Sequence, residues 1–161
     1  MASRARIGVV GGTGAVGSVT LGLLREHGFD DVRVFASARS AGKQVAGLTV
    51  EEATPEALAR GDVDVFLFSV GTGASRELVP HAVSGGATAI DKSSAYRLEP
   101  GIPLVVPEVN GGRALEHDLR LNQPGKVCVC GFHAQIQARQ AGHVAQIEAR
   151  IMSGTARIAD G

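Results

Sequence analysis

The sequence contains no tryptophan, and aromatic residues make up only 4% of its 161 positions. A hydrophobic core must therefore be built mainly from valine, leucine, isoleucine and alanine. The 16 basic and 16 acidic side chains cancel, so no excess of positive charge favours nucleic-acid binding. The two cysteines, Cys128 and Cys130, are too few for a disulfide framework.

No run of residues is long and apolar enough to cross a membrane, and the apolar stretch behind the basic N-terminus is too short for a signal peptide. We therefore expect a cytoplasmic protein with neither a membrane nor a nucleic-acid partner. The length of 161 residues suits one domain with a real core and hardly two.

A cluster of glycines follows the first apolar run of the chain, at residues 7–10. Its spacing is G-x-x-G-x-x-G when read from Gly11 and G-x-G-x-x-G when read from Gly12. In such a loop the glycines permit a tight strand-to-helix turn, close approach of a pyrophosphate, and close packing of the helix on the strand. The N–H groups and the positive dipole end of the helix would face the phosphates. The stretch therefore predicts a dinucleotide site.

Apolar runs and helical patterns alternate along the chain as far as Asn110. The alternation predicts a single α/β domain of Rossmann type, with a doubly wound, mostly parallel sheet. The carboxyl ends of its strands would bring Gly12, Ser69 and Asp91 together. Strands are expected at residues 7–10, 31–36, 48–51, 63–69, 87–91 and 103–107, and helices at residues 15–27, 55–61 and 75–84.

The helix expected at residues 15–27 carries its own apolar pattern. Its residues predicted to face the sheet are Val16, Val19, Leu23 and Leu24. The next helix has Thr54 as its N-cap and Pro55 at its first position, which is a typical helix start.

The end of the second strand bears on the choice of dinucleotide. NAD-preferring domains carry Asp or Glu there, about 20 residues after the glycines, to bind the ribose 2′-hydroxyl. This sequence has Ser37, Arg39 and Ser40 instead, and no acid. A planar guanidinium beside two hydroxyls suits a 2′-phosphate, which predicts NADP rather than NAD. The alternative is that Arg39 is a solvated loop arginine.

A dense polar cluster follows the strand expected at residues 87–91. It contains Asp91, Lys92, Ser93, Ser94 and Arg97. Its hydroxyls and cations could hold an anionic substrate group. An Asx- or Ser-based turn with solvated charges explains the same pattern, and the residues alone do not decide between the two.

Several motifs occur in a specific order and spacing: the glycine loop, Ala36-Ser37-x-Arg39-Ser40-Ala41-Gly42-Lys43, Phe68-Ser69-x-Gly71, Asp91-x-Ser93-Ser94-Ala95-Tyr96-Arg97 and Val106-Pro107-Glu108-Val109-Asn110. Together they resemble the nucleotide-binding half of aspartate-semialdehyde dehydrogenases, over about residues 5–110. The family that reduces N-acetyl-glutamyl phosphate shares the fold, but the Ser-Ser-Ala-Tyr-Arg and Pro-Glu-Val-Asn strings favour the aspartate branch. The resemblance implies an oxidoreductase of amino-acid biosynthesis, which carries out the NADP-dependent reductive dephosphorylation of L-aspartyl 4-phosphate.

The resemblance also implies which residues form the site. Arg39 and Ser40 would contact the 2′-phosphate, and Arg97 would bind the phosphate of the acyl-phosphate substrate. Lys92 stands where the family usually has Asn, so the family's contact at that position is not carried over. The other residues that would lie along the dinucleotide are Gly12, Thr13, Gly14, Ala15, Val16, Ser69 and Gly71.

The catalytic residues of that family have no clear counterpart here. Its members place a cysteine nucleophile in an Asn-Pro-x-Cys turn, and no such string occurs in this sequence. Cys128 or Cys130, together with His133, could replace it, but the Val-Cys-Val-Cys alternation is more typical of a strand whose thiols pack as small apolar groups. Cys-x-Cys with one nearby histidine provides too few ligands for a metal site, so none is predicted. His117 and His143 are expected at the surface.

Extended short-chain reductases share the glycine spacing but need Tyr-x-x-x-Lys for proton transfer, and Tyr96 is followed at that distance by Pro100. Two functions stay open: an NADP-dependent dehydrogenase that is truncated or altered in its catalytic half, and a non-catalytic NADP-binding module. We expect an NADP-binding domain over residues 1–116 and a divergent segment over residues 117–161, with a helix at residues 133–152. The implied partners are a dinucleotide, an acyl-phosphate substrate and, in a homodimer, a second copy of the chain.

Overall fold

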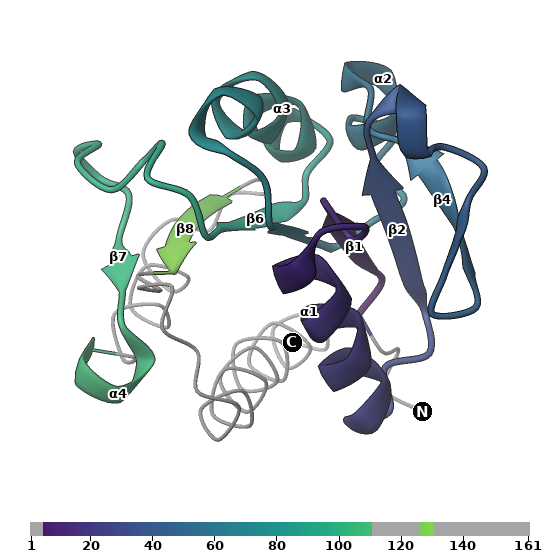
Figure 1. Ribbon diagram of the computed structural model, residues 1–161. Coiled ribbons are helices and arrows are strands. Elements are labelled where there is room, and N and C mark those ends of the chain that lie inside the picture. Colours follow the sequence, from purple (N-terminus) through teal and green to yellow (C-terminus); the bar gives the residue numbers. More distant parts are fainter. Residues whose placement is uncertain (1–4, 111–125, 131–161) are drawn as a thin grey trace, which may run out of the picture.

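The computed structural model describes residues 5–110 and 126–130, which form a sheet flanked by helices (Figure 1). The strands are β1 (Ile7–Val10), β2 (Val32–Ala36), β3 (Gln44–Val45), β4 (Leu48–Glu52), β5 (Val65–Phe68), β6 (Thr88–Asp91), β7 (Leu104–Val105) and β8 (Lys126–Cys130). Their order in the sheet is β3-β4-β2-β1-β5-β6-β8-β7. Neighbouring strands are parallel except β3 and β4, which form an antiparallel hairpin.

The helices are α1 (Ala15–Glu26), α2 (Pro55–Leu58), α3 (Thr72–Ser84) and α4 (Pro107–Asn110), with a 3-10 turn η1 (Ala38–Ser40). Helix α1 lies on one face of the sheet, and α2 and α3 lie on the other (Figure 1). Because alternate residues of a strand point to opposite faces, β1 contributes Val9 to the core under α1 and Val10 to the core under α3. The predicted doubly wound α/β fold is confirmed.

Every strand and helix predicted before Asn110 is present, with ends that differ by a few residues. The Thr54 cap is also confirmed, since its Oγ1 accepts a hydrogen bond from the Ala57 N–H at 3.2 Å. Strand β3 was not predicted: its hairpin turn places Ala46 and Gly47 at positive φ (51° and 78°), and Ala46 carries no turn signal. The segments at 117–125 and 131–161, including the helix predicted at 133–152, lie outside the described residues.

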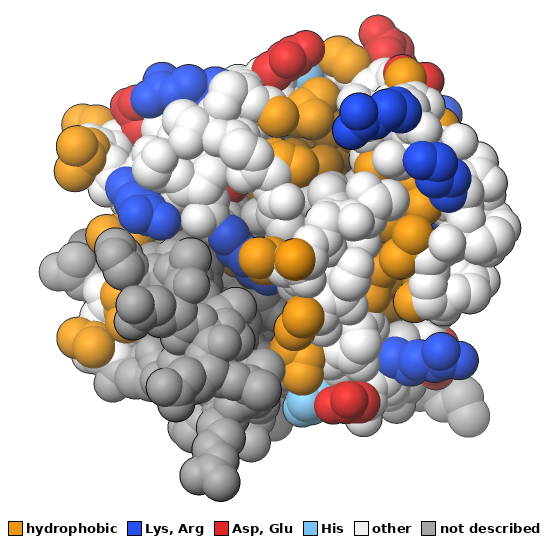
Figure 2. Space-filling model, viewed as in Figure 1, with side chains coloured by type: hydrophobic (Ala, Val, Ile, Leu, Met, Phe, Trp, Pro, Cys, Tyr) orange, Lys and Arg blue, Asp and Glu red, His pale blue; other side chains and the backbone are white. Residues whose placement is uncertain are grey.

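The predicted inward face of α1 is wrong in part. Leu24 is buried, but Val16 and Val19 are 43% and 47% exposed, and the buried positions are Gly17, Thr20, Leu21 and Leu24. Gly17 permits this rotation, because a Cβ at this position would collide with the backbone of the glycine loop. Figure 2 accordingly shows hydrophobic side chains on the solvent side of α1. None of the helices within residues 5–110 is long and apolar enough to cross a membrane.

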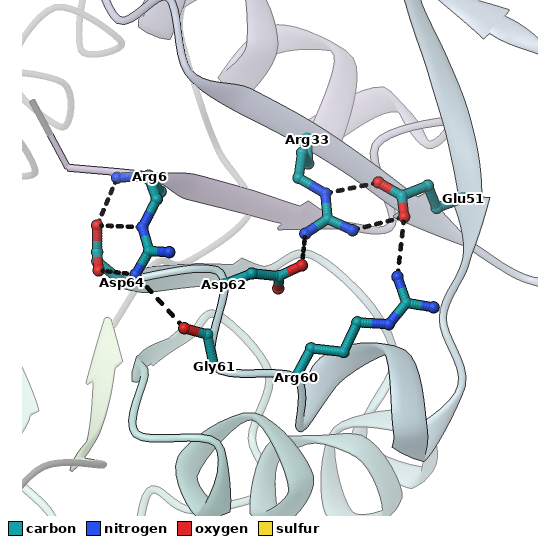
Figure 3. A network of polar contacts seen from close by, with 7 residues as sticks. All are labelled: Arg6, Arg33, Glu51, Arg60, Gly61, Asp62 and Asp64. Carbon is teal, nitrogen blue, oxygen red and sulfur yellow. Dashed lines mark hydrogen bonds and ion pairs between the residues drawn. The ribbon is translucent and has the colours of Figure 1, made fainter.

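A network of ion pairs lies at the amino end of the central strands (Figure 3). Arg33 of β2 donates from Nε and Nη2 to the two carboxylate oxygens of Glu51 at 2.7 and 2.6 Å. Its Nη1 lies 2.6 Å from a carboxylate oxygen of Asp62. Beside it, Arg6 makes a two-point contact with Asp64 at 3.1 and 2.7 Å. These contacts connect the amino ends of β1, β2 and β5, opposite to the edge at which the glycine loop lies, and they tie β2 to Glu51 near the carboxyl end of β4.

Candidate dinucleotide-binding site

The connections of the sheet diverge at the carboxyl ends of β1 and β5. Strand β1 continues through α1 to β2 on one side, and β5 continues through α3 to β6 on the other. In open parallel sheets, ligands bind in the crevice at such a point. It is bordered here by the glycine loop and by residues 69–71, and the Ser69 N–H donates to the Val10 carbonyl at 2.8 Å. The structure therefore brings the predicted Gly12 and Ser69 to one edge of the sheet.

Three glycines of the loop are required by the packing of the protein itself. Gly11 has φ +85°, and a Cβ added there would collide with the Ser69 carbonyl oxygen. A Cβ at Gly12 would collide with the Val34 side chain. A Cβ at Gly17 would collide with the Gly11 carbonyl and lie 2.7 Å from the Gly12 Cα. Gly11 and Gly12, the starting glycines of the two sequence spacings, therefore both need to be glycine.

Gly14 is different, because nothing in the described fold demands a glycine there. An added Cβ would find its nearest neighbour, the Gly11 carbonyl oxygen, at 3.4 Å. Gly14 is the N-cap of α1, which begins without a side-chain cap, and Thr13, Ala15 and Val16 beside it are exposed. An uncapped helix N-terminus with open space around it is a suitable place for an anionic group.

The end of β5 provides a second uncapped helix start. Gly71 is the N-cap of α3 and again makes no side-chain cap. The Ser69 Oγ is buried and has no hydrogen-bond partner among the described residues. A buried hydroxyl without a partner is costly, so this group is available to a ligand in the crevice.

The end of β2 carries the residues predicted to select the cofactor. Ser37 and Arg39 are exposed, and Ser40 is half-buried at the end of η1. Within the described part of the chain, Arg39 makes no hydrogen bond or ion pair. Glu52 was missed from the sequence: it ends β4 in register with Ala36, one residue beyond the predicted strand, and places an acid near this end.

The structure resolves most of the ambiguity in the polar cluster after β6. Asp91 is fully buried, and its carboxylate accepts from the Ser75 hydroxyl at 3.0 Å and from the Ser93 N–H and hydroxyl at 2.9 and 2.7 Å. This is the Asx turn of the second interpretation, so Asp91 and Ser93 are occupied internally. Ser94 is exposed and shares a hydrogen bond of 2.9 Å with the Thr72 hydroxyl at the start of α3.

Lys92 and Arg97 have different surroundings. The Lys92 ammonium donates to the Thr20 hydroxyl of α1 at 2.9 Å, a contact that joins two elements and has no local sequence signal. Arg97 is half-buried, donates from Nη2 to the Lys92 carbonyl at 3.5 Å, and has a buried Nε without a partner among the described residues. Burial, together with the Asp91 carboxylate, raises the pKa of Tyr96, whose hydroxyl donates to the Ser75 carbonyl at 3.4 Å.

The strand predicted from the Val-Cys-Val-Cys alternation is confirmed as β8. Cys128 stands opposite Ile90 of β6, and Cys130 stands opposite Val105 of β7. Cys130 ends β8, so its backbone reaches the same edge of the sheet as the glycine loop. His117, His133 and His143 lie outside the described residues, and no group of three or more metal-ligating side chains occurs within them.

A separate pocket of about 280 Å³ lies near the amino end of β2, away from the predicted site. It is lined by residues of α1, β2, the loop between them and the β3–β4 hairpin, among them Leu21, Phe29 and Leu48. None of the predicted site residues takes part in it.

Comparison with known proteins assigns the described fold. Residues 6–117 match the family model described as semialdehyde dehydrogenase, NAD binding domain. An aspartate-semialdehyde dehydrogenase of Streptomyces akiyoshiensis is 47% identical over 107 residues, which are 65% of this chain and 31% of that protein. The Bacillus subtilis enzyme is 44% identical over 118 residues, which are 70% of this chain and 34% of that protein.

Solved structures agree with the sequence comparison. The crystal structure of aspartate semialdehyde dehydrogenase II complexed with ASA from Vibrio cholerae aligns with a TM-score of 0.66 and 34% identity, over 79% of this chain and 38% of that one. The chain thus spans about a third of the length of the curated relatives it matches. By its NAD-binding domain, with the glycine loop of β1 at its centre, the chain belongs to the semialdehyde dehydrogenase family.

Proposed function

We propose that this chain binds NADP(H) in the crevice between the ends of β1 and β5 and forms the dinucleotide-binding part of an aspartate-semialdehyde dehydrogenase. The observation that carries the proposal is Arg39, which is exposed after β2 and has no partner among the described residues, while the glycine loop is hydrogen-bonded to β2 through the Gly11 N–H and the Phe35 carbonyl. The diphosphate would lie against residues Gly12, Thr13, Gly14, Ala15 and Val16. Two observations support this fit. The described fold has room for a side chain at Gly14, so the glycine leaves open space for a bound diphosphate. The buried Ser69 hydroxyl has no partner among the described residues and is available to a ligand.

Cofactor selection follows from charge at the end of β2. Arg39 would bind the 2′-phosphate with Ser37 and Ser40 as neutral donors, and Ser69 and Gly71 would lie along the rest of the dinucleotide. The Glu52 carboxylate at the end of β4 would repel a 2′-phosphate bound nearby and so lower the affinity for NADPH. NADPH, when bound, supplies a hydride.

The substrate we propose is L-aspartyl 4-phosphate, which the dehydrogenase would reduce to the semialdehyde with release of phosphate. Arg97 would hold the phosphate of this acyl phosphate, because its Nε has no partner in the described fold and its Nη2 makes only a long contact. A cysteine thiolate would be needed to attack the acyl carbon. Cys130, and less directly Cys128, are the candidates because β8 ends at this edge of the sheet.

The second candidate function is an NADP-binding module without catalysis. The observation that favours it is that no Asn-Pro-x-Cys string occurs in the sequence. Turnover separates the two functions: phosphate-dependent oxidation of aspartate semialdehyde, lost in the Cys128→Ser, Cys130→Ser double variant, supports the enzyme. NADPH binding with no turnover at any substrate concentration supports the module.

The cofactor assignment is tested by binding titrations of NADPH and NADH. We expect Arg39→Glu to weaken NADPH binding about tenfold or more and to leave NADH binding nearly unchanged, because only NADPH carries the 2′-phosphate. Arg25→Glu, an equal charge change at an exposed position near the end of α1, is the matched control. Equal affinity of the Arg39→Glu variant and the parent for NADPH would refute the assignment.

The Glu52→Gln variant tests the direction in which this carboxylate changes NADPH affinity. Removal of a nearby negative charge should raise NADPH affinity or leave it unchanged, and it should not lower it. A clear loss of NADPH affinity would mean that Glu52 contacts the ribose, as an acid does in NAD-preferring domains.

A further inference from the structure

The sheet ends at β7 with backbone groups that another strand could use. Among the described residues β7 is the terminal strand, and it consists only of Leu104 and Val105. Its inner side pairs with β8, where Val105 stands opposite Cys130. A terminal strand directs N–H and C=O groups outward, and such an edge is a template for pairing with another chain.

The side chain of Asn110 occupies these outward groups. Its Nδ2 donates to the Leu104 carbonyl at 2.9 Å, and its Oδ1 accepts from the Val106 N–H at 2.6 Å. Residues two apart on a strand direct their backbone groups to the same side, so both bonds lie away from the side on which Val105 meets β8. One carboxamide thus makes the two bonds that a residue of an added parallel strand would make.

Helix α4 aims this side chain. The N–H groups of Val109 and Asn110 both donate to the Val106 carbonyl, at 2.9 and 2.8 Å, and this tight turn folds Asn110 back along β7. Only a carboxamide suits the position, because it carries a donor and an acceptor together, whereas a carboxylate lacks the donor. We infer that Asn110 is an edge-sealing residue that holds β7 closed against strand addition by a second copy of this chain.

A second copy is the partner that this edge fits. Leu98 and Val109, which flank β7 in sequence, are 96% and 80% exposed, and Figure 2 shows isolated hydrophobic groups on that side of the molecule. A two-fold related copy would bring the same outward backbone groups and the same apolar side chains to the interface. Removal of the seal therefore exposes a surface that is complementary to itself.

The test compares Asn110→Ala, which loses both bonds, with the unchanged chain. Hydrogen exchange should show the Val106 N–H protected in the unchanged chain and exchanging at least about tenfold faster in the variant. Light scattering over a range of concentrations should show the variant forming a larger species than the unchanged chain. Asn110→Asp should lose protection only in part and should not self-associate, because a charge at the edge opposes pairing.

Val109→Ala is the control, since it removes an exposed side chain beside Asn110 and leaves both bonds in place. It should retain the protection and the oligomeric state of the unchanged chain. The inference is overturned if the Val106 N–H of the unchanged chain exchanges as fast as a free amide, a result that does not depend on whether any variant folds. It is also overturned if Asn110→Ala loses protection but keeps the parent oligomeric state.

Discussion

Individual glycines in one loop have separable roles, although the sequence presents them as a single motif. Gly17 has no room for a side chain, since a Cβ there meets the backbone of Gly11 and Gly12. Gly14 has room for one and an extended backbone (φ −84°, ψ 168°) that any residue adopts. Packing therefore explains Gly17, and we attribute Gly14 to the space that a bound diphosphate needs.

This division predicts opposite outcomes for two matched substitutions. Gly17→Ala should lower the free energy of unfolding by about 1–3 kcal/mol, because the helix must move away from the loop. Gly14→Ala should lower it by less than about 1 kcal/mol, through the weaker N-cap, and should instead weaken NADPH binding. Urea unfolding and a binding titration on both variants check this. A strongly destabilised Gly14→Ala variant would show that the loop is tighter than its geometry indicates.

The carboxyl group of Asp64 predicts a pH dependence of stability. Hydrogen bonds from Arg6 lower the pKa of Asp64 below its ordinary value of 3.8. A carboxyl whose pKa is lower in the folded state contributes stability above its unfolded pKa, and this contribution is lost as pH falls through the folded pKa. The difference in unfolding free energy between the parent and Asp64→Asn should therefore be constant at neutral pH and shrink below about pH 4. A difference that grows under acid would contradict the assignment.

At the scale of elements, local signals predicted what is local. The β-branched run before the glycines gave β1, and Thr54-Pro55 gave the start of α2. The rotation of α1 could not be predicted in this way, because Val16, Val19 and Leu23 form as plausible an apolar stripe as the one that packs. The contact of Gly17 with the loop decides between the two stripes, and that contact exists only once the helix has docked.

In the candidate site, too, features that follow from local sequence could be predicted, and contacts between distant elements could not. The positions of Gly12, Ser69 and Arg39 after their strands could be predicted because parallel strands end at a common edge, and the cofactor contacts of these residues stay a prediction. The partners of Asp91 and Lys92 could not, since Ser75 and Thr20 come from different helices. The bonds from Asn110 to β7 also depend on a turn that its motif does not reveal.

Strand pairing near the amino end of β2 depends on Arg33, which connects β2 to Glu51 of β4 and to Asp62 in the loop before β5. Its hydrogen bonds with Glu51 raise its pKa above the ordinary value, so the guanidinium stays charged, and it lies 5.0 Å above the Phe35 ring. Arg33→Met should lower the free energy of unfolding by about 1–2 kcal/mol, because two partly buried carboxylates lose their partner. Arg60→Met, which removes only a 3.8 Å contact with Glu51, is the control and should cost less than about 0.5 kcal/mol.

For the whole molecule, the order of the strands in the sheet differs from their order in the sequence. Strand β8 follows β7 in the chain but lies between β6 and β7 in the sheet, so residues after the last family motif form part of the sheet. The boundary predicted at residue 116 stays a prediction, and β8, which lies beyond it, pairs with both β6 and β7.

Because the dinucleotide crevice is formed by loops from several strands, bound NADPH should stabilise the whole fold. A ligand that binds only the folded state at 100 times its Kd adds about 2.7 kcal/mol of stability. For a domain of this size, that shift raises Tm by about 5–10 °C. NADH at the same concentration should raise Tm less, since it lacks the 2′-phosphate that Arg39 is proposed to bind. In the Arg39→Glu variant the two cofactors should give nearly equal shifts, whereas Arg25→Glu should keep the difference. Thermal unfolding of the parent and the two variants with each cofactor measures this directly, and equal shifts in the parent would refute NADP selection while leaving dinucleotide binding intact.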